Sequence, residues 1–216
     1  MALALNHIQR LAMQSDPNWQ GGRYRRDAAP TAGLGIAHAI AMCSYKSAEL
    51  LTKRYARPPN RDGNDPCRSP EEKFDVAGYL DHHRAEFTSR FDANTYITLS
   101  KAMDVFDLER SYGSEESAFA RIRARVLAIG ISTDWLFPAG DIRAFTARMQ
   151  AARVRARYAE LASSQGHDAF LAHVDGLSDV IKSQDGLLSA RPAQHPPPNA
   201  LRLDKPVIAV PRLDFA

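Results

Sequence analysis

The sequence has few cysteines, no long apolar run and no strong excess of one charge. Of its 216 residues only 2 are cysteine, Cys43 and Cys67, and they form no Cys-x-x-Cys pair. This excludes the disulfide framework that stabilises small secreted domains, and it favours free thiols in a reducing compartment. No stretch is long enough to cross a bilayer, and the N-terminus lacks the basic region of a signal peptide. We therefore expect a cytoplasmic protein without a membrane partner.

The charge balance excludes a strong field of either sign. The chain has 28 Lys+Arg against 25 Asp+Glu, which leaves a net charge of +3. Such a small excess does not predict a nucleic-acid partner. The arginines occur in short clusters at the edges of predicted elements, where solvated side chains are typical. These clusters are also compatible with a phosphate-bearing ligand.

Two kinds of chemical motif are also missing. The chain contains no Gly-x-Ser-x-Gly motif, the tight turn that exposes a nucleophilic serine between a strand and a helix. Metal-ligand spacing is absent too, because His82 and His83 are adjacent and point about 100° apart on a helix. We expect neither a metal site nor a bound cofactor.

The sequence predicts a first helix, a loop at 17–30, and then only helices as regular structure from 33 to 123. The expected helices cover 1–16, 33–45, 47–55, 76–91, 92–106 and 114–123. Ser47 and Asp92 are placed to cap two of them. The helix after Asp92 is predicted to bury one stripe, formed by Tyr96, Leu99, Met103 and Phe106. The stretch 60–70 is dense in turn-forming residues and is expected to be an exposed loop.

The pattern changes after residue 123. The continuous apolar run at 126–131 predicts a strand of a parallel sheet, buried on both faces. A helix is expected from about Pro138, then a second strand that begins near Val154, and then a final helix that carries Phe170, Val174, Leu177 and Ile181. The order βαβα predicts an α/β fold with two parallel strands.

Asp134 and His167 stand at the carboxyl ends of these strands. Asp134 comes three residues after Ile131, and His167 comes six residues after Leu161. Functional groups of open α/β sheets gather at this edge. A carboxylate that orients a histidine base is one interpretation of the pair. The other is that Asp134 caps the helix near Pro138 and that His167 is an ordinary loop histidine.

A family resemblance favours the first interpretation. Ser-x-Asp-Trp-Leu-Phe-Pro at 132–138 and Gly-His-Asp-Ala-Phe-Leu at 166–171 resemble the Asp and His motifs of the homoserine O-acetyltransferase family. Further stretches resemble the same family in order, and together they cover about 1–183: 16–22, the helix that begins at Gly33, 74–80, 90–96 and 102–104. The family consists of acyltransferases with the α/β-hydrolase fold, so the resemblance implies the C-terminal part of that fold with an inserted helical lid.

The resemblance also implies a division of the chain. Residues 1–17 would form a leading helix of the core, 18–123 the helical lid region, and 124–183 the βαβα part of the core. Residues 184–216 would form a proline-containing mobile tail, in which 207–210 allows an edge strand.

The implied reaction is a two-step acyl transfer. A serine takes the acyl group from acetyl-CoA or another acyl-CoA, which is a co-substrate, and an amino-acid hydroxyl then accepts it. Asp134 and His167 match the catalytic Asp and His of the family, and Asp168 matches the acidic residue that holds the acceptor. The alternative interpretation of Asp168 is a helix N-cap or an anion of the first turn, and this is compatible with the implied role.

Two departures from the family pattern limit what is implied. His38 stands where the family has a substrate-binding arginine, which puts homoserine as acceptor in doubt; His38 either contacts the substrate or is a buried, hydrogen-bonded residue of a lid helix. The catalytic serine is absent, so the chain is expected to be inactive alone and to need an N-terminal half.

Several alternatives therefore stay open. The intact protein is a homoserine O-acetyltransferase of methionine biosynthesis, another enzyme of the same fold such as a serine O-acyltransferase or an esterase, or a noncatalytic piece that needs a separate half. The sequence fixes neither the acyl donor, nor whether Met1 is the true start, nor the oligomeric state, although the lid helices allow a homodimer.

Overall fold

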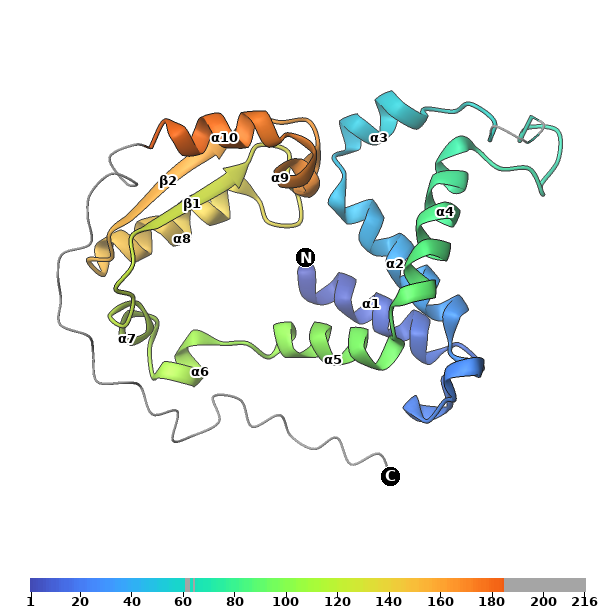
Figure 1. Ribbon diagram of the computed structural model, residues 1–216, viewed down its shortest axis with the longest axis horizontal. Helices are drawn as coiled ribbons and strands as arrows, with labels where there is room; N and C mark the ends of the chain where they lie inside the picture. The colour runs from blue at the N-terminus through green and yellow to red at the C-terminus, as the bar shows by residue number, and fades with distance from the viewer. Residues whose placement is uncertain (61–62, 64, 185–216) are drawn as a thin grey trace.

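The computed structural model describes residues 1–60, 63 and 65–184. Figure 1 shows two parts: strands β1 and β2 with their helices on one side, and a group of helices that includes α1, α2 and α4 on the other. Helix α5 extends from the helical group toward α6 and α7, which lead into β1. The predicted edge strand at 207–210 and the rest of the predicted tail lie outside the described residues.

The described helices follow most of the predicted boundaries. They are α1 (Ala2–Gln14), α2 (Thr31–Tyr45), α3 (Ala48–Tyr55), α4 (Asp75–Arg90), α5 (Ala93–Asp104), α6 (Leu108–Tyr112), α7 (Glu115–Phe119), α8 (Ala139–Ala151), α9 (Ala169–Ala172) and α10 (Val174–Lys182), with the short 3-10 helices η1 (Gln20–Gly22), η2 (Arg26–Ala28) and η3 (Gly166–Asp168). None of the described helices combines the length and the apolar composition needed to cross a membrane.

Two predicted helix caps are confirmed. The Ser47 side chain accepts a hydrogen bond from the backbone N–H of Leu50 at the start of α3. The Asp92 side chain accepts one from the backbone N–H of Thr95 at the start of α5. Each cap satisfies a backbone donor that the first turn of a helix leaves without a partner.

Helices α1 and α2 cross at very close range. A Cβ atom added to Gly33 would lie 2.5 Å from the carbonyl oxygen of Ala12, so only glycine fits at this crossing. Asp16 fixes the crossing further, because its buried carboxylate accepts a 2.7 Å hydrogen bond from the backbone N–H of Gly33. Met13 and Leu34 pack beside it in the core of the helical group.

The prediction of a buried stripe on α5 is wrong for three of its four residues. Tyr96 is partly buried and donates a hydrogen bond to Gln9 of α1. Leu99, Met103 and Phe106 have exposed fractions of 54%, 65% and 67%. Helix α1 packs on α5 along one side, and within the described part of the chain no other helix packs extensively against it. Helix α5 therefore has an apolar side, but no element covers the C-terminal part of that side among the described residues.

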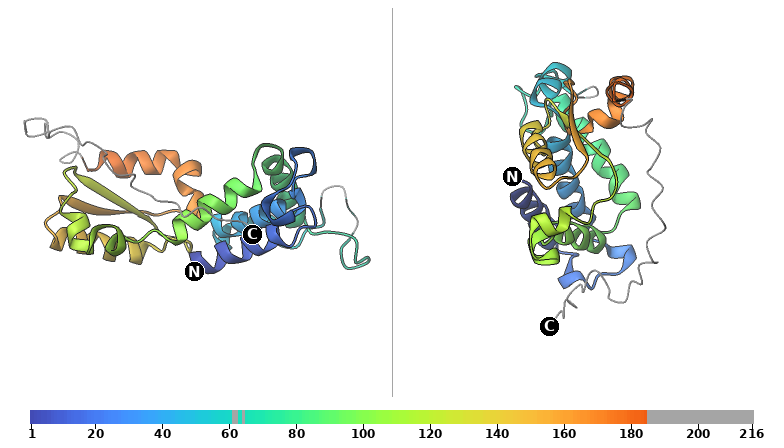
Figure 2. Two further views of the ribbon diagram at one scale, coloured as in Figure 1. Left: turned by 90° about the horizontal axis from the view of Figure 1, so that it is seen from below. Right: turned by 90° about the vertical axis from the view of Figure 1, so that its left-hand side faces the viewer.

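The sheet has two parallel strands, as predicted. β1 (Val126–Ile131) pairs with β2 (Ala156–Leu161) in a register that places Ile131 opposite Leu161. Figure 2 shows α8 on one face of the strands and α10 on the other. The prediction that β1 is buried on both faces is only partly right, since only Gly130 and Ile131 are fully buried. Among the described residues β1 has a paired strand on one edge alone, which explains the incomplete burial.

Two predicted helices are interrupted. The helix expected at 114–123 ends at Phe119, and the short helix α6 before it was not predicted; Gly113 separates the two with a φ of 85°, a conformation that ends a helix. The final helix is broken at His173, whose φ of −124° and ψ of 55° are not helical. It is therefore divided into α9 and α10, and η3 forms the turn that precedes α9.

Candidate functional site

The site lies where β1 and β2 end side by side. Because the strands are parallel and in register, the loops that follow them leave from the same edge of the sheet. Two side chains of the first loop join it to the second: Ser132 accepts a hydrogen bond from the backbone N–H of Ser163, and Thr133 accepts one from that of Gly166. Both hydroxyls are thus used to hold the loops together. This explains the presence of Ser132 near Asp134 without a nucleophilic role.

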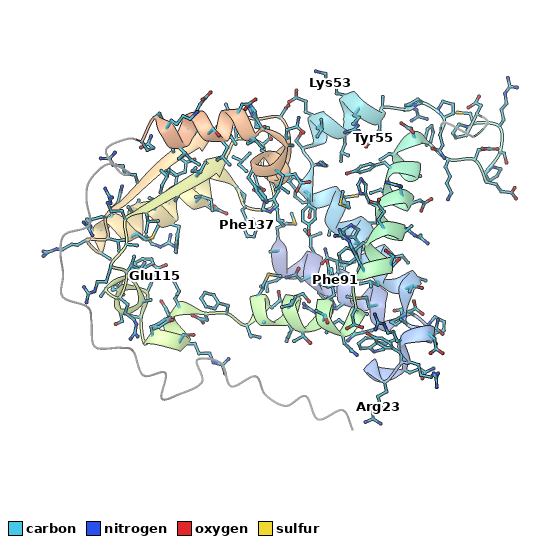
Figure 3. All side chains as sticks on the ribbon, in the orientation of Figure 1. Arg23, Lys53, Tyr55, Phe91, Glu115 and Phe137 are labelled. Atoms are coloured by element: carbon cyan, nitrogen blue, oxygen red, sulfur yellow. The ribbon has the colours of Figure 1, made fainter. Side chains whose placement is uncertain are left out.

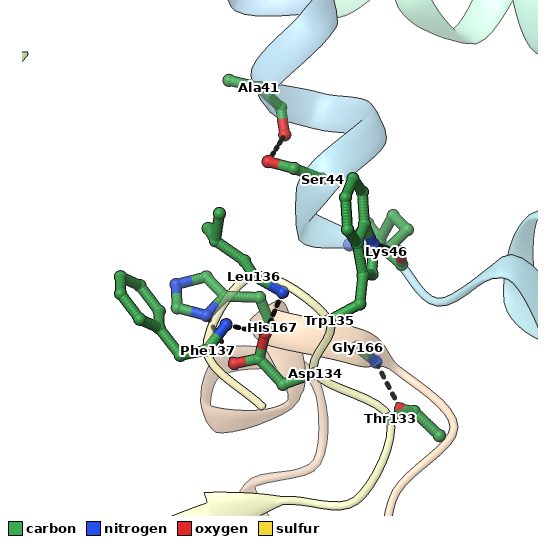
Figure 4. A network of polar contacts seen from close by, with 10 residues as sticks. All are labelled: Ala41, Ser44, Lys46, Thr133, Asp134, Trp135, Leu136, Phe137, Gly166 and His167. Carbon is green, nitrogen blue, oxygen red and sulfur yellow. Dashed lines mark hydrogen bonds and ion pairs between the residues drawn. The ribbon is translucent and has the colours of Figure 1, made fainter. Parts of the chain in front are cut away.

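The structure brings Asp134 and His167 together. The Nδ1 atom of His167 lies 2.8 Å from Oδ2 of Asp134. The other carboxylate oxygen accepts hydrogen bonds of 2.9 Å from the backbone N–H groups of Leu136 and Phe137, as the dashed lines in Figure 4 show. Asp134 is 8% exposed, so these donors satisfy a carboxylate that is almost out of water.

This geometry determines what the imidazole can do. A carboxylate accepts hydrogen bonds, so Nδ1 of His167 donates and Nε2 of the neutral ring carries no proton. Nε2 is the atom that a general base uses to take a proton. Rings of Tyr45, Phe137 and Phe170 surround the imidazole with centroid distances of 5.8, 5.4 and 5.8 Å. The interpretation of Asp134 as the cap of the helix near Pro138 is wrong, because α8 has no side-chain cap hydrogen bond and Asp134 instead accepts from the turn at 136–137 that precedes it.

Asp168 forms an ion pair with Lys46. Its Oδ2 atom lies 2.8 Å from Nζ of Lys46, and the two side chains are 19% and 18% exposed. Asp168 also occupies the N-cap position of α9, although its side chain makes no capping hydrogen bond. The negative charge of Asp168 also adds to the main effect of burial in raising the pKa of Tyr45. Lys46 thus belongs to the surroundings of the site.

His38 lies further back along α2 and is half-buried. Its ring stacks on Phe87 with a centroid distance of 4.0 Å and an interplanar angle of 3°. Burial lowers the pKa of His38, and the nearby His83 and Arg90 lower it further, so the ring is neutral at pH 7. His38 is not among the residues that line the hollow beside His167.

A hollow of about 710 Å³ opens between the two parts of the molecule. His167 and Phe137 line it from the loops of the sheet, and helices α1, α2, α4 and α5 contribute mainly apolar side chains. Figure 3 labels two lining residues, Phe91 and Phe137. Asp104 is the charged side chain of this lining that pairs with Arg10, at 2.5 Å. The hollow is large enough for a small-molecule substrate and has the candidate base in its wall.

Sequence reasoning missed the residues that support the pair. Lys46 is 122 residues from Asp168 in the chain, and no local pattern links them. Thr133 lies in the loop after the first strand, within the stretch 132–138. A hydroxyl at the end of a strand was the available signal for a contact with the neighbouring loop. In the part of the chain that the structure describes, no group of three or more His, Cys, Asp or Glu side chains is placed to bind a metal ion.

Comparison with known proteins shows that the chain is similar to O-acyltransferases, as its Asp134 and His167 motifs indicate. The chain is 40% identical over 180 residues to a homoserine O-acetyltransferase of Symbiobacterium thermophilum, with 83% of this chain and 47% of that protein covered. It is also 40% identical over 182 residues to a serine O-succinyltransferase of Litchfieldella anticariensis, with 83% and 49% covered. The matched 83% of this chain is thus related to members of the homoserine O-acetyltransferase family. The chain spans about half the length of the curated relatives that it matches. No model of a protein family matches the chain.

Solved structures show the same fold. The homoserine O-acetyltransferase of Bacillus anthracis superimposes with a TM-score of 0.74 at 22% identity, with 89% of this chain and 50% of that chain covered. Esterase E22 superimposes with a TM-score of 0.71 at 19% identity, with 84% and 49% covered. The predicted α/β class, part of an α/β-hydrolase fold, is therefore confirmed. The similarity to the esterase concerns the fold alone.

Proposed function

We propose that this chain supplies the carboxylate and the base of an acyl-CoA-dependent O-acyltransferase that acts on the hydroxyl of an amino acid. The hydrogen bond between His167 and Asp134, at the ends of two adjacent parallel strands, is the observation that carries this proposal. The identity to acyltransferases of this family supports it. Membership in methionine biosynthesis is part of the same proposal.

In the proposed reaction His167 moves one proton in each of two steps. Its Nε2 takes the proton of a serine hydroxyl as that oxygen attacks the thioester of acetyl-CoA or another acyl-CoA, and gives this proton to the sulfur of the leaving CoA as the C–S bond breaks. The acceptor hydroxyl then gives its own proton to Nε2 as it attacks the acyl-serine, and Nε2 passes this proton to the serine oxygen as the bond between serine and the acyl group breaks. Asp134 stabilises the imidazolium that forms in each step.

The serine of this scheme comes from additional polypeptide. No serine hydroxyl of the described residues is hydrogen-bonded to His167, and the chain lacks the Gly-x-Ser-x-Gly turn. A small cavity of about 260 Å³ beside β1 is lined by Ile129, Ile131, Ile142 and Leu177, together with His167. Such an apolar lining next to a strand supports the proposal that a segment like the unmatched half of the relatives packs here and brings the nucleophile.

The acceptor site is proposed to include Asp168. In this proposal the carboxylate of Asp168, one residue from the base, pairs with Lys46 and also accepts a hydrogen bond from the ammonium group of an amino acid. His38 is a weaker candidate, because its neutral ring stacks on Phe87 and offers no fixed positive charge to a carboxylate. Relatives of equal identity are named for homoserine with acetyl and for serine with succinyl, so the proposal names the class of acceptor and donor. A homodimer through the lid helices and a cytoplasmic location stay predictions.

A hybrid protein tests this function. The chain is joined to the complementary half of the Symbiobacterium thermophilum relative, and acyl transfer is measured with acetyl-CoA or succinyl-CoA and with homoserine or serine. We expect transfer with at least one pair, and a decrease of kcat by about a thousandfold or more in His167→Ala. His173→Ala, a change in the next loop, is the control and should keep most of the activity. A hybrid that unfolds cooperatively but transfers no acyl group, or keeps its rate in His167→Ala, contradicts the proposal.

A further inference from the structure

The turn between α2 and α3, residues 46–47, contacts both loops of the candidate site. On the side of Asp134, the indole N–H of Trp135 donates a 3.1 Å hydrogen bond to the carbonyl oxygen of Lys46. Trp135 directly follows Asp134, so this bond fixes the loop next to the carboxylate. Figure 4 shows Lys46 and Trp135 beside the Asp134–His167 pair.

The same turn holds the loop of His167 at three points. The ammonium of Lys46 pairs with Asp168, the residue after the histidine. The hydroxyl of Ser47 donates a 2.5 Å hydrogen bond to the carbonyl oxygen of Ser164. Gly166, with a φ of 73°, presses against the turn so closely that a Cβ atom would lie 2.5 Å from the backbone nitrogen of Ser47. The backbone of the loop therefore has no room to move toward α2.

Lys46 is the residue that joins the two loops through one side chain and one carbonyl group. Its side chain is 18% exposed and its partner Asp168 is 19% exposed, so water screens this ion pair less than a surface pair. A second ion pair of the same length, Lys73 with Asp81, is 56% and 43% exposed and lies on and next to α4. The pair of Lys46 with Asp168 is thus a partly buried contact at the site, whereas the pair of Lys73 with Asp81 is an exposed surface contact.

We propose that Lys46 is a positioning residue that holds His167 and Asp134 at hydrogen-bonding distance. It acts through Trp135 and Asp168, the chain neighbours of the two site residues, and touches neither reacting atom. The effect of Lys46 on catalysis rests on the proposed function. Its effect on the distance between His167 and Asp134 does not. Because Lys46 directly follows α2, a movement of this helix changes the alignment of the base.

Proton NMR of the full chain with ¹⁵N-labelled histidine tests the proposal. The hydrogen bond to Asp134 gives the Nδ1 proton of His167 a low-field resonance and slow exchange with solvent. We expect Lys46→Met to accelerate this exchange by about tenfold or to broaden the resonance beyond detection. Lys46→Arg keeps the charge and should restore the resonance. Lys73→Met, the matched control, should leave it unchanged.

Each result has a defined meaning. A Lys46→Met resonance identical to that of the parent, or one altered equally by Lys73→Met, overturns the proposal. If Lys46→Met does not unfold cooperatively, Trp135→Phe replaces it, because this change removes the indole N–H and keeps an aromatic ring; unchanged exchange there is equally decisive against the proposal. The resonance does not require the nucleophile, so an inactive hybrid with an intact resonance counts against the proposed function and not against the role of Lys46.

Discussion

Helices α2 and α5 both carry many apolar residues, on nearly all sides of α2 and on one side of α5, and they differ in what covers them. Helix α2 lies between α1 and α4, and Leu34, Ala37 and Ala41 are at most 2% exposed. Helix α5 packs on α1 along one side, and Leu99 and Met103 are more than half exposed. Apolar residues in the sequence therefore identify a helix surface that is suited to packing. Whether this surface is buried depends on whether another element packs against it.

Truncation of one leucine in each helix tests this comparison most directly. Leu34→Ala removes a side chain that is 2% exposed, and we expect the free energy of unfolding to fall by about 3 kcal/mol. Leu99→Ala removes one that is 54% exposed, and the loss should be below about 0.5 kcal/mol. Urea unfolding of both variants gives the values. Equal losses would show that α5 is covered in solution.

A glycine pair tests the close crossing of α1 and α2. The added methyl group of Gly33→Ala would lie 2.8 Å from Cα of Met13, so the helices must separate, and we expect a loss of about 2 to 3 kcal/mol. Gly140→Ala in α8 meets nothing within 4 Å and should stabilise the protein by roughly 0.5 kcal/mol, because alanine favours a helix. The two changes are compared by thermal unfolding. A neutral Gly33→Ala would contradict the described crossing.

The pH dependence of unfolding tests the contact between α1 and α5. Burial acts to raise the pKa of Asp104, but hydrogen bonds from Asn6 and Arg10 and the charge of Arg10 outweigh it and lower the pKa below its usual value. A lowered pKa in the folded state means that the stabilisation is present above the unfolded-state pKa, about 3.9, and is lost as the pH falls through the folded-state value. We expect a decrease in stability below about pH 4 that is smaller than the effect of Leu34→Ala. In Asp104→Asn this part of the decrease should disappear, and an unchanged profile would argue against the ion pair.

Polar substitutions on the uncovered face should have the smallest effect on folding. We expect Met103→Gln together with Phe106→Ser to change the free energy of unfolding by less than about 0.5 kcal/mol. The same pair should reduce self-association, measured by sedimentation, because it removes exposed apolar surface. His82→Gln, an exposed change on α4, is the control. Unchanged self-association would show that Met103 and Phe106 do not contribute to contacts between molecules.

The sequence predicts local structure well where the signal is local. The apolar run at 126–131 has the boundaries of β1, and Ser47 and Asp92 cap the helices that they were expected to cap. The proximity of Asp134 and His167 follows from two parallel strands in succession, which place their carboxyl ends together.

Features that depend on distant contacts could not be predicted in this way. The ion pair of Lys46 with Asp168 joins residues far apart in the chain, and the exposure of Leu99 depends on an absence of neighbours. The break at His173 is also invisible in the pattern, because Phe170, Val174 and Leu177 keep helical spacing across it. Tertiary contacts decide the ion pair and the exposure of Leu99, whereas no contact among the described residues explains the break at His173.

Helix α5 also acts as a spacer between the two parts of the molecule. Its 12 residues span about 18 Å, since each residue of an α-helix adds about 1.5 Å. The chain runs from the helical group through this helix and then through α6 and α7 into β1. Helix α5 therefore forms one wall of the hollow in front of His167, and a deletion of one turn would shorten this wall while the contacts of Lys46 and Ser47 still hold the loop of the base.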